Sequence, residues 1–202
     1  QLPESLWPIL KRQVEEAAKH WRQPDRGIWE VRGEPRHFTS SKVMCWVAMD
    51  RGARLARMYG EPAFAKRWDA LAEEIKADIL ANGVDTRGAF TQHYGTTALD
   101  ASLLLVPLLH FLPPDDPRVR ATVLAIADEL TSDGLVLRYV TEETDDGLSG
   151  EEGSFTICSF WLVSALVQIG ELARARALCE RLLSFASDLN LYAEEIDPRS
   201  GR

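Results

Sequence analysis

The sequence predicts an all-α protein that forms part of an (α/α)6 barrel, in which an inner ring of helices is surrounded by an outer ring. Three observations predict this fold. Helical periodicity dominates the 202 residues, and no convincing strand is present. The predicted helices alternate between amphipathic and uniformly apolar, and the connections alternate between short and long. Seven predicted helices cannot close a ring of six hairpins, so we expect the barrel to be incomplete at both ends of this chain.

The predicted helices differ in how their apolar residues are distributed. A helix that is apolar on every side is buried on every side, as an inner ring requires, whereas an amphipathic helix suits the outer ring. Inner helices are expected at 40–59, 98–111 and 155–169. Outer helices are expected at 4–20, 62–81, 116–131 and 171–186. The apolar stripe of the 62–81 helix consists of Phe64, Trp68, Leu71, Ile75 and Ile79.

Short connections follow the inner helices, and long connections follow the outer ones. Because neighbouring helices run antiparallel, every second connection lies at the same end of the bundle. Four long loops therefore gather at one end and face the N-termini of the inner helices, which is a common way to build a site. These loops cover about 22–39, 82–97, 132–154 and 187 onward. An α-solenoid of helical hairpins is the alternative, but no repeat of fixed period supports it.

Composition and charge narrow the classes of partner. The net charge of -8 argues against a nucleic-acid-binding surface, which needs clustered Lys and Arg. The apolar stretch near 98–112 is too short to span a membrane and is closed by Pro113 and Pro114. The cysteines lie in apolar helical patterns without disulfide spacing, which predicts reduced thiols in a cytoplasmic protein. They are Cys45, Cys158 and Cys179.

Each long loop combines aromatic side chains with carboxylates or carboxamides. The mixture suits a neutral sugar, since aromatic faces cover the C–H side of a pyranose while carboxylates and arginines bind its hydroxyls. The first loop has Asp25, Trp29, Glu30, Arg32 and His37; the second has Phe90, Gln92, His93 and Tyr94; the third has Arg138, Tyr139, Asp146, Glu151 and Glu152; the fourth has Tyr192, Glu194, Glu195 and Asp197. Taken alone, the acidic pairs in these loops are also typical of solvated surface charges.

Other chemistries lack a pattern in this sequence. The four histidines have no metal-ligand spacing, and neither HExxH nor CxxC occurs, so no metal is expected. No GxSxG, P-loop or GxGxxG is present, which leaves acyl transfer and nucleotide cofactors without support.

Five motifs occur in order along the long loops and the helix starts: "GIWE-R----HFT-SK--CWVA-DR", "GAFTQHYG---LDASLLL", "GL--RY", "DGL-G-EGSF" and "YAEEIDP-SG". Together they resemble glycoside hydrolase family 15, which contains glucoamylases, glucodextranases and bacterial trehalases. The resemblance runs from about residue 21 to the C-terminus. It implies that the seven helices correspond to helices 5 to 11 of an (α/α)6 barrel. It also implies hydrolysis of α-glucosidic bonds with inversion, by two glutamates and without a cofactor.

The resemblance also implies roles for individual residues. It assigns the general acid to Glu30 in the Trp-Glu motif, and the general base to Glu194 in "EEID". Inversion needs these carboxyl groups about 6.5–9.5 Å apart, with a water between them. Arg138 resembles the family's arginine that holds the non-reducing glucose. The expected substrate-binding residues are Trp29, Gln92, Tyr94, Arg138, Tyr139, Glu152, Tyr192 and Glu195. A surface role is expected for Arg32, Glu34 and Arg36.

Residues 1–202 are therefore expected to form a partial catalytic domain. An N-terminal domain, the first four barrel helices and the last helix are expected to lie outside this chain. The expected ligand is a small α-glucoside or oligosaccharide, and the motifs do not distinguish trehalose, maltose, isomaltose or dextran. They also leave open whether the chain forms a homo-oligomer. A second hypothesis is a catalytically incomplete, carbohydrate-binding or scaffold remnant of such a barrel, because part of the pocket is absent.

Overall fold

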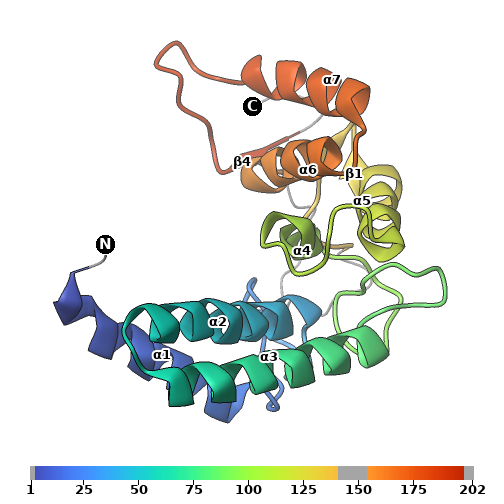
Figure 1. The fold of residues 1–202 in the computed structure, drawn as a ribbon. Coiled ribbons are helices and arrows are strands. Elements are labelled where there is room, and N and C mark those ends of the chain that lie inside the picture. Colours follow the sequence, from blue (N-terminus) through green and yellow to red (C-terminus); the bar gives the residue numbers. More distant parts are fainter. Residues whose placement is uncertain (1–2, 141–153, 198–202) are drawn as a thin grey trace.

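Helices follow one another around an open arc in the computed structural model, which describes residues 3–140 and 154–197 (Figure 1). The helical elements are η1 (Glu4–Leu6), α1 (Trp7–His20), α2 (Thr39–Met58), α3 (Pro62–Asn82), η2 (Ala101–Leu104), α4 (Leu105–Leu108), α5 (Pro117–Glu129), α6 (Thr156–Gln168) and α7 (Leu172–Leu183). Four short strands complete them: β1 (Thr131–Ser132), β2 (Leu135–Val136), β3 (Ser154–Phe155) and β4 (Glu195–Ile196).

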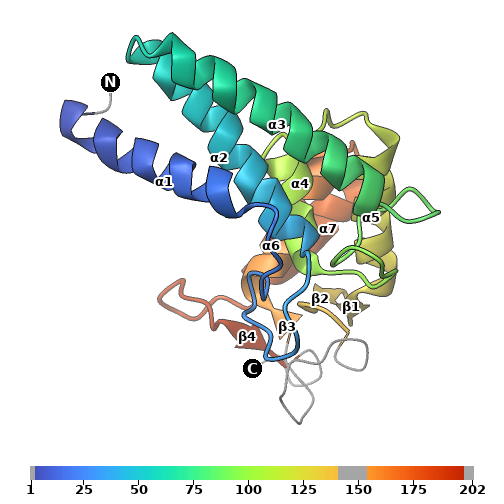
Figure 2. The ribbon, with the colours of Figure 1, turned by 90° about the horizontal axis from the view of Figure 1, so that it is seen from below.

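The arc has the two layers that the helix alternation predicts. Helices α2, α4 and α6 form the inner layer, while α3, α5 and α7 lie outside them (Figure 1). Helix α3 packs on α2, α7 packs on α6, and α5 contacts α6 and η2. The loop that precedes α2, strand β3 at the start of α6, and strand β4 lie together at one end of the helices (Figure 2). The predicted incomplete (α/α)6 arrangement is confirmed.

Aromatic side chains join α1 to the α2–α3 hairpin. Trp68 is fully buried, and its indole Nε1 donates a hydrogen bond to Glu15 Oε1 at 2.8 Å. Trp7 stacks on Tyr59 with ring centroids 4.9 Å apart, and its Nε1 donates to Glu61 Oε1 at 3.0 Å. The Trp7 and Trp68 indoles thus bury their rings and still satisfy their N–H groups, as such residues require.

The predicted helix at 98–111 is wrong in its regularity and length. The segment forms the 3-10 helix η2 followed by a single turn, α4. Pro107 has no N–H to donate to the Leu103 carbonyl, and its ring would clash with that carbonyl in a continuous α-helix. Asp100 is extended, with φ -147° and ψ 134°, so the helix cannot begin at 98 either. The segment is still buried in the inner layer, as its apolar character predicted.

Four two-residue strands occur where the sequence predicted none. Strands β1 and β2 form an antiparallel hairpin around Asp133 and Gly134, which have φ of 47° and 74°. An Asp-Gly pair with two positive φ angles is the favoured geometry for a two-residue hairpin turn. Strand β3 pairs antiparallel with β4, which joins the third long loop to the fourth.

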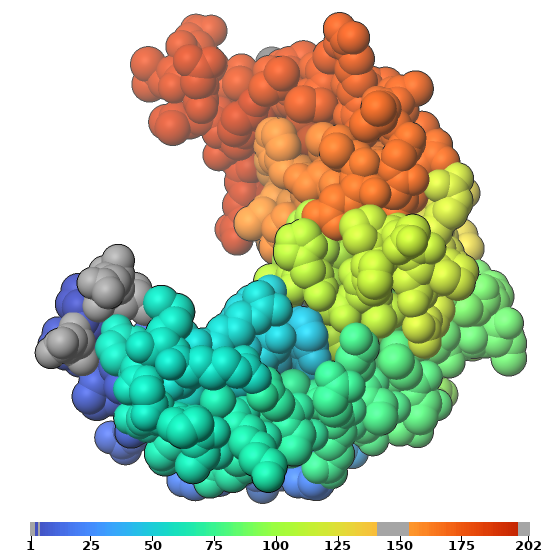
Figure 3. Space-filling view, viewed as in Figure 1, coloured from blue at the N-terminus to red at the C-terminus, as the bar shows by residue number. Residues whose placement is uncertain are grey.

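The inner layer is covered on one side only. Figure 3 shows an open hollow between the arm formed by α1–α3 and the arm formed by α6 and α7. Three apolar side chains of α2 and α6 are about half exposed, although these helices were predicted to be buried all round: Met44, Ile157 and Val167. An arc that does not close leaves such positions without a neighbour. No helix within the described residues is both long and apolar enough to cross a membrane.

Close packing of α1 against α2 depends on Gly52. A Cβ atom at this position would lie 2.9 Å from both Cγ atoms of Val14 and 3.2 Å from Trp68 Cε3. Alanine is the better helix former by about 1 kcal/mol. We nevertheless expect Gly52→Ala to lower the free energy of unfolding by about 1–3 kcal/mol, because overpacking a tight contact outweighs propensity. Urea denaturation of the two chains measures the difference.

Val14→Ala provides the control for this prediction. In that background the two methyl groups that meet the new Cβ are gone and only the 3.2 Å contact with Trp68 Cε3 remains, so Gly52→Ala should cost clearly less free energy of unfolding than in the unchanged chain. Stabilisation by Gly52→Ala in the otherwise unchanged chain would contradict the packing argument.

Candidate active site

Each inner helical segment begins with the same contact to the next long loop. The first residue of the segment donates its backbone N–H to a loop carbonyl. The pairs are Thr39 with Gln92 (3.0 Å), Ala101 with Arg138 (2.8 Å) and Thr156 with Glu194 (2.9 Å). The first N–H groups of a helix have no partner inside the helix, so each contact satisfies a donor and fixes a loop. Three predicted site residues thereby hold equivalent positions around one end of the arc.

The residue before each of these donors pairs with the next loop as well. The antiparallel pairs are Phe38 with His93, Asp100 with Tyr139, and Phe155 with Glu195. The first loop is thus joined to the second, the second to the third, and the third to the fourth. The site is built on a continuous line of backbone contacts rather than on four independent loops.

Charged residues hold the first loop in shape from within. Arg26 Nη1 donates to the carbonyl oxygens of residues 31, 32 and 33, at 3.2, 2.9 and 2.6 Å. Asp25 Oδ1 accepts from Gly27 N at 2.6 Å and from Ser41 Oγ at 2.8 Å. The buried Lys42 donates to the Trp21 carbonyl at 2.5 Å. Much of the loop's unusual charge therefore satisfies its own backbone.

Trp29 lies in a cluster of aromatic rings around Arg138. The Trp29 ring centroid is 6.0 Å from that of Phe155 and 6.3 Å from that of Trp161. The Arg138 guanidinium carbon is 4.3 Å from the Phe155 centroid, 5.3 Å from that of Tyr139 and 5.6 Å from that of Trp29. A guanidinium among aromatic faces is stabilised by cation–π attraction. The structure thus brings Trp29, Arg138 and Tyr139 together.

Asp100 completes this cluster and was not named by the sequence analysis. Its side chain is buried and accepts hydrogen bonds from the Trp29 indole (3.0 Å to Oδ1), the Gln92 amide (3.2 Å) and the Ser102 N–H (2.8 Å). Burial raises the pKa of this carboxyl, while the hydrogen bonds from Ser102, Trp29 and Gln92 act in the opposite direction. A helix-capping pattern, Asp directly before an apolar helical run, was the available sequence signal.

Glu30 follows Trp29 with an unusual backbone. Its φ is 52°, in the left-handed region, and its N–H donates to the Gly27 carbonyl at a long 3.3 Å. For a residue with a Cβ this conformation costs about 1–2 kcal/mol and is concentrated at functional sites. The carboxylate is exposed, and no residue of 3–140 or 154–197 makes a hydrogen bond or ion pair with it.

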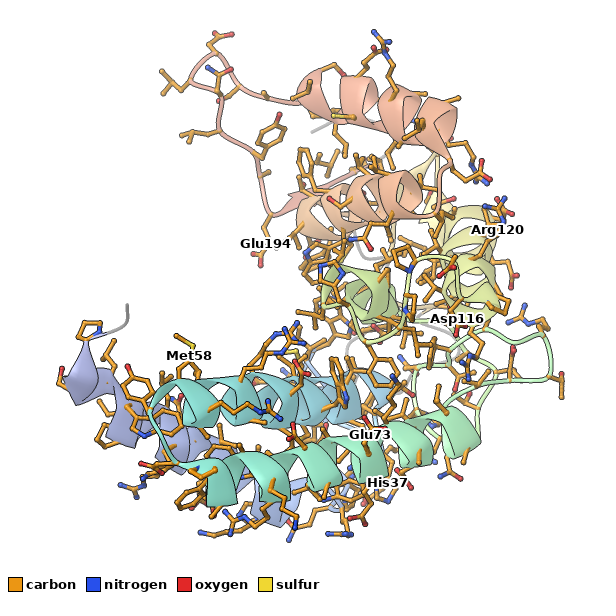
Figure 4. All side chains as sticks on the ribbon, viewed as in Figure 1. His37, Met58, Glu73, Asp116, Arg120 and Glu194 are labelled. Carbon is orange, nitrogen blue, oxygen red and sulfur yellow. The ribbon has the colours of Figure 1, made fainter. Side chains whose placement is uncertain are left out.

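Glu194 is joined to the same aromatic cluster through the backbone, since its carbonyl accepts the N–H of Thr156, the residue after Phe155. Its side chain is exposed and projects into the hollow of the arc (Figure 4). Its neighbour Glu195, also exposed, pairs with the backbone of Phe155, whose ring packs on Trp29. Both predicted catalytic glutamates are therefore one residue away from a group that contacts Phe155. An α-solenoid adaptor would be favoured if Glu30 and Glu194 lay at opposite ends of the fold. Their shared connection to Phe155 argues against it.

Two further predicted substrate-binding residues lie apart from the Trp29–Arg138 cluster. The Tyr94 hydroxyl donates to Asp78 Oδ2 on α3 at 2.7 Å, and its ring stacks on His37. Tyr94 lines a pocket of about 380 Å³ together with Lys42 and Asp78, and this pocket does not include Trp29 or Arg138. The Tyr192 ring packs edge-on against Phe160 of α6, with centroids 5.5 Å apart.

The remaining predictions concern the residues expected at the surface, Glu152, and metal binding. As expected, Arg32, Glu34 and Arg36 are exposed. The predicted Glu152 lies outside the described residues. Within the part of the chain that the structure describes, no group of three or more His, Cys, Asp or Glu side chains is arranged to hold a metal ion.

Comparison with known proteins identifies the family. Residues 1–202, the whole chain, match the family model described as glycosyl hydrolases family 15. The chain belongs to this family. It is 79% identical over 202 residues to a trehalase of Mycobacterium tuberculosis and 40% identical over 197 residues to a trehalase of Thermoplasma acidophilum. These matches cover 100% and 97% of this chain but only 30% and 34% of the relatives, so the chain spans about a third of their length.

Solved structures agree with this family 15 assignment at the level of the fold. A bacterial glucoamylase complexed with acarbose matches with a TM-score of 0.77 at 14% identity, covering 96% of this chain and 34% of that one. A glycosidase in complex with glucose matches with a TM-score of 0.76 at 21% identity, covering 93% and 50%. The described arc is therefore part of a glucoamylase-like, six-hairpin barrel.

Removing the Arg26 side chain should loosen the first loop. Arg26→Ala leaves three carbonyls without their shared donor, at an expected local cost of about 1 kcal/mol. We expect several-fold faster amide hydrogen exchange over residues 29–33. Arg32→Ala is the matched control, because Arg32 is an exposed arginine of the same loop. Equal exchange rates in the two variants would contradict the bracing role of Arg26.

Proposed function

We propose that this chain carries the acid, the base and part of the glucose-binding surface of an inverting α-glucoside hydrolase that acts on trehalose. The main support is the common ring of backbone contacts that fixes Gln92, Arg138 and Glu194, joined through Phe155 to the loop of Glu30. Trehalose is proposed as the substrate because relatives of up to 79% identity over the whole chain bear the name trehalase.

The two glutamates have complementary tasks in this proposal. Glu30 donates a proton to the glycosidic oxygen as its bond to the anomeric carbon breaks. Glu194 accepts a proton from a water whose oxygen attacks that carbon from the opposite side, so the configuration inverts. The Glu194 carbonyl accepts the N–H of Thr156 at the N-terminus of α6, and the positive end of a helix dipole is a favourable neighbour for a carboxylate.

The surrounding residues bind the sugar. Arg138, held among aromatic rings, directs its N–H donors to hydroxyl groups of the non-reducing glucose, and the Trp29 ring covers part of the same subsite. Tyr139, Glu195 and Tyr192 shape the neighbouring surface. Tyr94 contributes less directly in this proposal, because its hydroxyl is already bonded to Asp78.

This segment is further proposed to be part of a longer catalytic domain. The arc is open, and the chain spans about 30% of the length of its M. tuberculosis relative. The same openness favours the second candidate, a carbohydrate-binding or scaffold remnant without activity. The 202-residue chain alone should show no measurable trehalose hydrolysis, whereas the full-length enzyme should hydrolyse it; glucose release measured for both decides between the two.

Replacing either glutamate should nearly abolish turnover. In the full-length enzyme, Glu30→Gln and Glu194→Gln should each lower kcat on trehalose by about 10²–10⁴-fold, the contribution of one positioned acid or base. Glu34→Gln is the matched control, since Glu34 is an exposed acid of the same loop, and it should retain full activity. Activity of Glu30→Gln or Glu194→Gln near that of Glu34→Gln would remove the residue from the mechanism.

The anomeric form of the products tests inversion directly. Trehalose joins two α-linked glucose units, so attack with inversion releases one β-glucose and one α-glucose. NMR during the first minutes of hydrolysis should therefore show equal amounts of both anomers. Release of α-glucose only would mean retention and overturn the assignment of Glu194 as a base that activates water.

A further inference from the structure

We propose that Asp100 is a positioning residue for proton donation, acting on Glu30 through the Trp29 indole. This inference rests on the proposed function, in which Glu30 is the general acid. It concerns a buried carboxylate that lies within the "LDASLLL" motif but for which no role was predicted.

The contacts of the Asp100 carboxylate hold one orientation of the indole. Trp29 Nε1 donates to Oδ1 at 3.0 Å and lies 3.1 Å from Oδ2. On its other side the carboxylate accepts from Ser102 N at 2.8 Å and Ser102 Oγ at 2.5 Å, and from Gln92 Nε2 at 3.2 Å. The Asp100 residue is only 2% exposed, so water cannot replace a lost partner freely. The indole N–H therefore has a fixed acceptor.

Contacts on both sides of Glu30 hold the loop: the packed Trp29 indole before it and the Arg26 bonds to the carbonyls of residues 31–33 after it. Glu30 has few contacts of its own. Its carboxylate has no bonding partner within the described residues, and its backbone N–H makes only a 3.3 Å hydrogen bond. Its φ of 52° is a conformation that a glutamate keeps only when neighbouring contacts impose it. The adjacent Trp29 supplies such contacts, bonded to Asp100 at one edge and packed on Phe155 at 6.0 Å.

Asp100 also sets the distance between the acid and the sugar-binding arginine. Its backbone pairs with Tyr139, and the next N–H, that of Ala101, donates to the Arg138 carbonyl at 2.8 Å. One residue thus joins the loop of Glu30, through its side chain, to the loop of Arg138, through its main chain. Loss of the carboxylate should shift Glu30 relative to bound glucose without removing either group.

The test compares two substrates in the full-length enzyme. Trehalose has a poor leaving group that needs protonation, whereas the fluoride of α-glucosyl fluoride leaves with much less help from an acid. Asp100→Asn keeps the shape of the side chain but replaces one carboxylate oxygen with an NH₂ group. That group cannot accept a hydrogen bond from Trp29, Gln92 or Ser102. We expect kcat on trehalose to fall about 10- to 100-fold, the effect of a misplacement of about 1 Å. KM should change less, and kcat on α-glucosyl fluoride should fall several-fold less than kcat on trehalose.

Two reference variants make each outcome decisive. Glu30→Gln should show the same preference for the fluoride, more strongly; equal losses on both substrates would overturn Glu30 as the acid and hence the proposed function. If Glu30→Gln shows the preference and Asp100→Asn does not, only the positioning role is overturned.

Asp116→Asn is the matched control at the start of α5 (Figure 4): Asp116 Oδ1 also accepts from a backbone N–H two residues ahead, at 2.9 Å. It should leave both rates unchanged.

Trp29→Phe covers the case in which Asp100→Asn does not fold. It keeps an aromatic ring and removes the N–H that reaches Asp100, together with part of the indole ring system. It should reproduce the preference for the fluoride, and its effect should not add to that of Asp100→Asn, because both variants break one contact. Equal losses on the two substrates in Trp29→Phe, or full additivity in the double variant, would overturn the proposal.

Discussion

The loops at one end of the arc depend on a single kind of hydrogen bond, from the first N–H of an inner helical segment to a carbonyl of the next long loop. It occurs at Thr39, Ala101 and Thr156. A helix leaves its first N–H groups unpaired, and here these donors organise the loops that follow. Because the helices are packed in two layers, the loop residues inherit the rigidity of the scaffold, as a site requires.

At this end of the molecule, buried residues join the loops to one another, and exposed residues are the ones proposed to act on the substrate. Asp100 and Phe155 are buried and are assigned no contact with a sugar, and Tyr139 is buried beside them; the backbones of these three residues join all the loops. The proposed acid and base, Glu30 and Glu194, are exposed, and each is next in sequence to a residue that contacts this buried cluster. In the proposed mechanism, precision thus comes from the interior, while the carboxyl groups of Glu30 and Glu194 stay accessible to substrate and water.

Most of the helix order could be predicted because it depends on local periodicity. The prediction failed at 98–111, where Pro107 and the extended Asp100 override an apolar pattern that looked continuous. The β1–β2 hairpin had a local signal, the Asp133–Gly134 pair, whereas the β3–β4 pair had none because its strands are about 40 residues apart.

The candidate site was predictable only in part, for the same reason. Motifs located Trp29 and Arg138, which the structure brings together. The direction of a side chain is a tertiary property, so no pattern could tell that Tyr94 turns towards Asp78 on α3. The role of Asp100 depends on partners that are distant in sequence, such as Trp29, and a capping pattern alone does not reveal them.

The left-handed backbone conformation of Glu30 lowers the stability of the fold. Glycine or asparagine would occupy the same φ at lower energy, so selection or redesign for thermal stability alone would favour replacing this glutamate. In the proposed mechanism, a thermostabilised descendant of this chain with that replacement would keep its helices and lose its general acid. At Glu30 the strained backbone coincides with the proposed acid, whereas at Asp133 the same region of φ serves a hairpin turn.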